Sequence, residues 1–106
     1  MKTFAENLAT LESVDHLASL ALFDAHGAVV ASIENKPGSQ GSLKLYYHLA
    51  KKWGSLNAEA AAEGLALYAE HTEDALSHPG KHPNIDRLAE IQQSKVGLSV
   101  RVFPPE

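Results

Sequence analysis

The chain has 106 residues, a hydrophobic fraction of 44%, a charged fraction of 21% and a formal net charge of −4. These values predict one globular domain over residues 1–106, and the acidic balance argues against a nucleic-acid-binding surface. Because the chain contains no cysteine, disulfides, thiolate nucleophiles and cysteine-based zinc sites are excluded.

The first predicted element is a short helix. Thr3 and Glu6 have the spacing of a capping box, in which each side chain accepts a hydrogen bond from the other residue's N–H. The N-terminal residues Met1–Asn7, which contain this capping box, lack the apolar core of a signal peptide. No apolar run reaches the length of a membrane span. We therefore expect a cytoplasmic protein without a membrane segment.

Two strands follow, over residues 19–23 and 28–33. Between them, Asp24 and Gly27 occupy the first and last positions of a four-residue turn that suits a hairpin. The alternation of the second strand predicts that one face carries Val29, Ala31 and Ile33.

Three further helices are predicted. The first follows a loop over residues 34–42, with Ser42 as its N-cap. The longest extends over residues 58–76 after Asn57 as its N-cap. Its expected buried stripe is Ala61, Leu65, Tyr68, Ala69, Thr72 and Leu76. The last helix starts at Pro83, a residue that suits the first turn.

A final strand over residues 97–103 completes an α+β fold. The predicted sheet is three-stranded and antiparallel, a hairpin plus a C-terminal strand, covered by about four helices. The sequence leaves the position of the last strand open. Because such a sheet has two free edges and the chain is small, we expect a homo-oligomer, most simply a dimer.

Residues 70–88 hold three of the six histidines. On a continuous helix, His71, Asp74 and His78 would lie within about 60° of each other, and the following Pro-Gly turn could return His82 to them. These four residues form a candidate polar cluster. Imidazoles with a carboxylate suit zinc, iron or manganese, so the same residues are the candidate ligands of a divalent metal. The alternative is that the histidines only interact with a helix C-terminus.

Two loops before helices form a candidate anion site. Their backbone N–H groups and lysines could hold a phosphate or carboxylate. The residues are Lys36, Gly38, Gly80, Lys81 and Asn84. Neither loop is a Walker motif, so nucleotide hydrolysis is not expected. The alternative is that glycine and proline shape the loops while the lysines are solvated.

Three segments carry a resemblance to a known family. They are Glu34-Asn-Lys-Pro-Gly-Ser-Gln-Gly-Ser42, Glu70-His-Thr-Glu-Asp74 and His78-Pro-Gly-Lys-His-Pro-Asn-Ile-Asp-Arg-Leu88. The chain resembles a family of small uncharacterised bacterial proteins of about this length. The resemblance implies a bacterial cytosolic protein and assigns no catalytic role to any residue.

Two functional classes remain. The first is a self-association or partner-binding module that acts by binding rather than by covalent catalysis. The alternative is a small metal- or anion-dependent enzyme that uses His71, Asp74, His78 and His82. Convergence of these side chains in a pocket favours the second class, whereas an exposed apolar patch or free strand edge favours the first.

Overall fold

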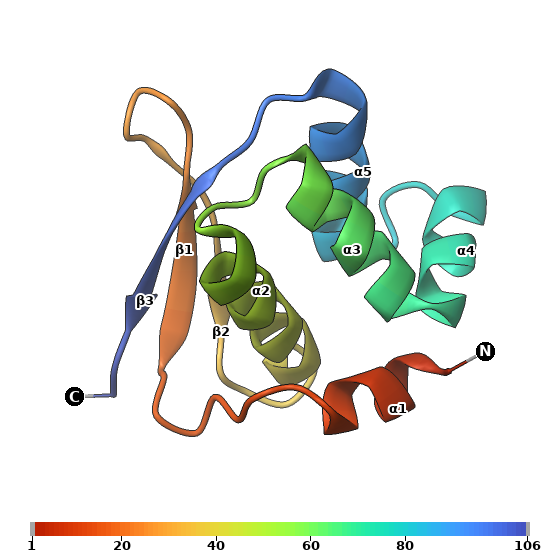
Figure 1. Cartoon of the computed structure of the whole chain (residues 1–106), viewed down its shortest axis with the longest axis horizontal. Coiled ribbons are helices and arrows are strands. Elements are labelled where there is room, and N and C mark those ends of the chain that lie inside the picture. The colour runs from red at the N-terminus through yellow and green to blue at the C-terminus, as the bar shows by residue number, and fades with distance from the viewer. Residues whose placement is uncertain (1, 106) are drawn as a thin grey trace.

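The computed structural model describes residues 2–105 and contains one three-stranded antiparallel sheet. The strands are β1 (Ser19–Phe23), β2 (Val29–Glu34) and β3 (Ser99–Phe103), and their order is β2-β1-β3. The described helices lie on one face of this sheet, and the opposite face is open (Figure 1). The predicted α+β fold is confirmed, and the last strand pairs with β1 rather than β2.

The hairpin turn forms as the sequence predicts. The Asp24 carboxylate accepts hydrogen bonds from the N–H groups of His26 and Ala28, and Gly27 has a φ of 82°. The prediction for Val29 is wrong. A shift in strand register next to Leu22 places Val29 opposite Phe23 on the open face, where it is 61% exposed. A single extra residue in a strand moves the side chains that precede it to the other face.

Five helices occur among the described residues: α1 (Phe4–Ala9), α2 (Gln40–Trp53), α3 (Ala58–Tyr68), α4 (Glu70–Ser77) and α5 (Pro83–Ser94). Both predicted capping features of Thr3 and Asn57 are confirmed, since each accepts the expected backbone hydrogen bond. The predicted start at Ser42 is wrong. The helix begins at Gln40, and Ser39 is its N-cap. The Ser39 hydroxyl donates to the Glu34 carbonyl at 2.6 Å, so the loop closes before it reaches Ser42.

The predicted helix over residues 58–76 is in fact two helices. Ala69 has φ 53° and ψ −117°, a conformation that a residue with a Cβ rarely adopts, and it separates α3 from α4. The Thr72 hydroxyl donates to the Leu65 carbonyl at 2.6 Å and ties the two helices together. Because the break redirects α4, Leu76 leaves the predicted buried stripe and is 68% exposed.

Ala69→Gly is expected to stabilise the protein by about 1 kcal/mol, because glycine adopts this backbone conformation without the strain that alanine carries. The matched control is Ala62→Gly at an exposed position inside α3, which is expected to lower stability by about 0.5–1 kcal/mol. Urea unfolding of both variants measures the difference. A loss of stability at position 69 equal to that at position 62 would contradict a strained junction.

The core lies between the sheet and the helices. The side chains of Leu20 and Leu22 on the central strand are fully buried against this layer. Tyr68 is buried as predicted, whereas Leu65 is only half-buried and packs on the edge of the core. The largest fully buried side chains are Tyr46, Leu20, Leu22, Leu43, Leu45, Leu49, Leu56 and Leu88.

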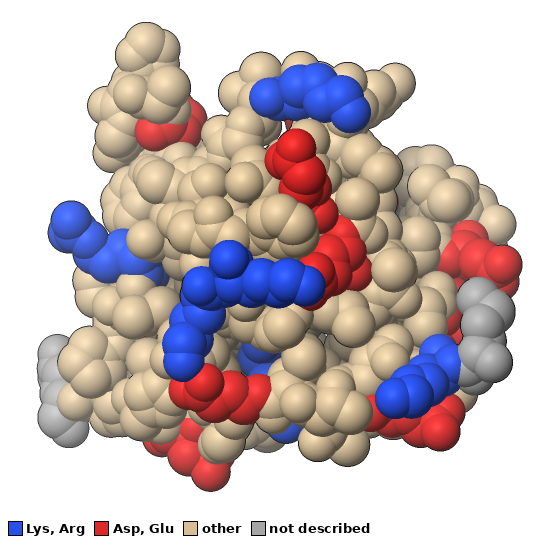
Figure 2. Space-filling model, in the orientation of Figure 1, with Lys and Arg blue, Asp and Glu red and all other residues tan. Residues whose placement is uncertain are grey.

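The surface charge is mixed on the face shown in Figure 2. Basic and acidic side chains lie beside one another there instead of separating into patches of one sign. One such neighbourhood joins α2 and α3, where Glu63 pairs with His48 and Lys52, each at 2.6 Å. Between residues 2 and 105, no helix is long and apolar enough to span a membrane.

Candidate functional site

A pocket of about 260 Å³ lies where α1, the loop before α2, the α3–α4 junction and the start of α5 meet. We call it the histidine pocket. Its apolar lining residues are Phe4, Tyr68, Pro83 and Ile85. Its polar lining consists of Gly38, Ser42, His71, Lys81, His82 and Asn84. None of these described lining residues carries a carboxylate.

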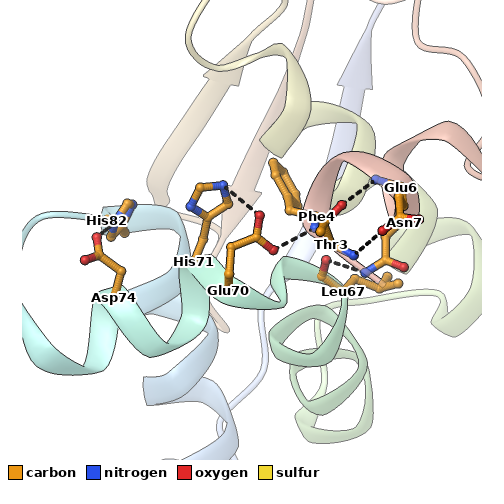
Figure 3. Close-up of polar contacts among 9 residues, drawn as sticks. All are labelled: Thr3, Phe4, Glu6, Asn7, Leu67, Glu70, His71, Asp74 and His82. Atoms are coloured by element: carbon orange, nitrogen blue, oxygen red, sulfur yellow. Dashed lines mark hydrogen bonds and ion pairs between the residues drawn. The ribbon is translucent and has the colours of Figure 1, made fainter. Parts of the chain in front are cut away.

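The break at Ala69 determines what α4 contributes to the pocket. Because α4 begins directly after this residue, His71 lies in its first turn and reaches the pocket. Glu70 next to it accepts a hydrogen bond from the Phe4 backbone N–H at 2.9 Å and so fixes α1 against the junction. Asn7 adds a second connection, since its amide donates to the Leu67 carbonyl at 2.9 Å (Figure 3).

Four rings form a continuous row along the pocket. The Tyr68 and Phe4 rings are stacked, with centroids 5.1 Å apart and an angle of 18° between their planes. His71 meets Phe4 edge-on at 5.1 Å, and its centroid lies 6.0 Å from that of His82. Figure 3 shows His71 between Phe4 and His82. The row therefore runs from an apolar end at Tyr68 to a basic end at His82.

Asp74 supports the basic end of the row. Its Oδ2 accepts hydrogen bonds from His82 Nε2 at 2.6 Å and from Lys81 Nζ at 3.0 Å, and its Oδ1 lies 3.3 Å from His78 Nδ1. The bonds from His82 and Lys81 lower the pKa of Asp74 from 3.8 to about 2. Since a carboxylate can only accept, His82 carries a proton on Nε2, and its Nδ1 is the nitrogen left to meet a ligand.

Asp74→Asn is expected to destabilise the protein at neutral pH but not in strong acid. A carboxyl group whose pKa is lower in the folded state stabilises above its unfolded pKa, and this contribution is lost as the pH falls from about 4 towards 2. Urea midpoints of wild type and variant should therefore differ at pH 7 and converge near pH 2. Asp15→Asn in an exposed turn serves as the control. An equal difference between the two urea midpoints at both pH values would show that the lost charge of Asp74 does not cause the destabilisation.

The structure brings most of the predicted polar cluster together. His78 and His82 both contact Asp74. His71 lies next to the His82 ring, with the two ring centroids 6.0 Å apart. No group of three or more histidine, aspartate or glutamate side chains within residues 2–105 is arranged to hold a metal ion. Lys81 provides a physical reason, because its ammonium group lies 3.0 Å from Asp74 Oδ2, where it would repel a cation on that oxygen.

The predicted anion residues divide between different environments. Gly38, Lys81 and Asn84 line the histidine pocket, so the two loops meet there. Lys36 does not line it and instead pairs with Glu34 at 3.1 Å on the surface. The N–H of Gly80 donates to Asp86 Oδ2 at 2.9 Å, and Gly80 lines a different pocket.

Five lining residues are not among the site residues that the sequence predicts: Phe4, Ser42, Tyr68, Pro83 and Ile85. The sequence pattern predicts Tyr68 as a core residue and Ser42 as a helix cap. In the structure the Tyr68 hydroxyl donates to Ser42 Oγ at 2.7 Å, and both residues line the pocket together with Phe4. The burial of Tyr68 raises the pKa of its hydroxyl, so this group remains a donor. No sequence pattern within one segment predicts this arrangement, because it joins residues of α1, α2 and α3.

A larger pocket of about 500 Å³ lies beside α5. Its lining includes the apolar side chains of Val30, Val96 and Leu98. Its arginine, Arg87, is already engaged, because its Nη1 donates to Asn84 Oδ1 at 2.8 Å and to the Tyr46 hydroxyl at 3.1 Å. Its lining also includes the carboxylates of Asp86 and Glu90, whereas the described lining of the histidine pocket includes none, so the histidine pocket is the better candidate for an anion.

Comparison with protein families gives one match. The model of DUF2322, described as an uncharacterized protein conserved in bacteria, matches residues 4–102. Comparisons with curated proteins and with solved structures found no match. The matched range includes every residue that lines the histidine pocket. The chain therefore belongs to the DUF2322 family of uncharacterised bacterial proteins.

Proposed function

We propose that this protein binds a small anionic molecule, a carboxylate or a phosphate, in the histidine pocket, and that it acts by binding rather than by covalent catalysis. The observation that carries this proposal is the lining of the pocket. His71, Lys81 and His82 meet there from two separate segments, and no carboxylate lies among the described lining residues.

The electrostatics of the pocket support an anion. Lys81 carries a positive charge that Asp74, at 3.0 Å, balances in part, and α5 begins two residues later at Pro83, so the positive end of its dipole lies beside Lys81. Asp74 is the hydrogen-bond partner of His82 but does not itself line the pocket. A ligand thus meets the basic groups, while Asp74 holds them in position.

Asp74, with its pKa lowered to about 2, stays ionised at neutral and mildly acidic pH, so it continues to accept the hydrogen bonds from His82 and Lys81.

Stabilisation by added ligand tests the proposal, because a molecule that binds only the folded state raises the unfolding midpoint. Acetate and inorganic phosphate at pH 6 serve as probes. Lys81→Gln should weaken binding about tenfold, as expected for the loss of a charge-assisted hydrogen bond. Lys36→Gln, which removes the same charge outside the pocket, should leave binding unchanged. Equal effects of the two substitutions would contradict a specific site.

The open face of the sheet favours a second role, self-association into a dimer. Phe103 and Val29 on this face are 39% and 61% exposed. Glu34 on β2 and Arg101 on β3 share the face at opposite edges, so a second copy related by a two-fold axis can oppose unlike charges. We propose this face as the interface. Light scattering at micromolar concentration should give twice the monomer mass, and Phe103→Asp should return it to the monomer.

A further inference from the structure

We infer that the ligand of the histidine pocket is an aromatic monocarboxylate, a compound with one flat apolar ring and one carboxylate group. This inference rests on the proposed function and makes it more specific. Its basis is the polarity of the ring row, which is apolar at Tyr68 and Phe4 and basic at His82 and Lys81. A small inorganic anion would use only the basic end.

The apolar end is suited to a flat ring. The half-buried Phe4 ring, which is stacked on the buried Tyr68 ring with nearly parallel planes, is the aromatic surface available here, and Ile85 also lines the pocket. Aromatic groups gain from offset or edge contacts with other rings in addition to the burial of their apolar area. The Tyr68 and Ser42 hydroxyls are bonded to each other, so they do not compete for a ring placed beside them.

The basic end determines the orientation. Lys81 Nζ and His82 Nε2 both donate to Asp74 Oδ2, which holds the two groups side by side. The ammonium group has further protons, and His82 has its Nδ1, so a carboxylate can receive one bond from each when His82 is protonated. The volume of about 260 Å³ limits the ligand to a small molecule.

Competition among three carboxylates tests the inference: acetate, cyclohexanecarboxylate and benzoate, measured at pH 6 by the shift of pocket resonances in NMR titrations. Benzoate should bind at least about tenfold more tightly than acetate, because a stacked ring in a pocket contributes roughly the free energy of one decade in affinity. It should also bind more tightly than cyclohexanecarboxylate, which has no flat face.

Phe4→Leu should lower the ratio of benzoate affinity to acetate affinity towards one. Leu8→Ala loosens the same helix, but Leu8 packs near Gly41 and does not line the histidine pocket. It should therefore keep the preference. If acetate binds and benzoate binds no more tightly, the aromatic inference is overturned and the anion site stands. If neither compound binds, the aromatic inference is overturned, and the anion site is overturned as well if inorganic phosphate, titrated in parallel, does not bind.

Discussion

Replacing Leu88 with alanine is expected to lower the free energy of unfolding by about 2–5 kcal/mol, the range for large-to-small substitutions in a packed core. Leu88 is fully buried where α5 meets α3. A Cβ built on Gly64 of α3 would lie 2.7 Å from Leu88 Cδ1 and 2.8 Å from Leu49 Cδ1. The helices thus approach closely around this side chain, and its removal leaves a cavity that they cannot readily fill.

The control for this prediction is Leu76→Ala. The sequence pattern assigns Leu76 to the buried stripe of a long helix, whereas the structure exposes 68% of it. Its substitution should change stability by no more than about 0.5 kcal/mol. Urea unfolding of both variants distinguishes the two descriptions. A large loss at Leu76, with a small one at Leu88, would show that α4 packs differently.

The second large effect concerns binding. Substituting asparagine for His71 and His82 and glutamine for Lys81 in one chain should weaken acetate binding about a hundredfold or more, since each charge-assisted hydrogen bond contributes roughly 1.5–3 kcal/mol. The substitutions remove every side chain among the described lining residues that can be positively charged. Isothermal titration at pH 6 measures the loss.

The control carries the same change in composition elsewhere. His16→Asn, His26→Asn and Lys36→Gln alter residues that lie outside the histidine pocket. This variant should bind acetate as wild type does. If it loses affinity to the same extent, the net charge of the protein, rather than the pocket, causes the binding.

The elements of the fold follow from local sequence signals. The three strands, the turn at Gly27 and the N-caps at Thr3 and Asn57 each depend on a few neighbouring residues, and each was predicted. The break at Ala69 was not, because neither glycine nor proline marks it. Alanine favours the helix interior, so only tertiary contacts can hold it at φ 53°. Where tertiary contacts outweigh the helix propensity of a residue in this way, the neighbouring sequence does not predict the break.

The candidate site could be predicted only in part for a related reason. The cluster around Asp74 depends on spacing within one stretch, and the Pro-Gly turn does return His82 to it. The meeting of Gly38 with Lys81 depends on how α2 and α5 pack, and the contribution of Phe4 depends on where α1 docks. These relations join distant segments, so no motif in a single segment encodes them.

The imidazole ring signals of His71 and His82 provide the most direct test of the proposed anion site. Titrating the protein with acetate at pH 6, with His26 in the exposed hairpin turn as the internal reference, follows the pocket and the surface in one experiment. We predict saturable shifts of both pocket histidines with a common dissociation constant and no saturable shift at His26. Equal weak shifts at all three histidines, or none, would contradict the proposal.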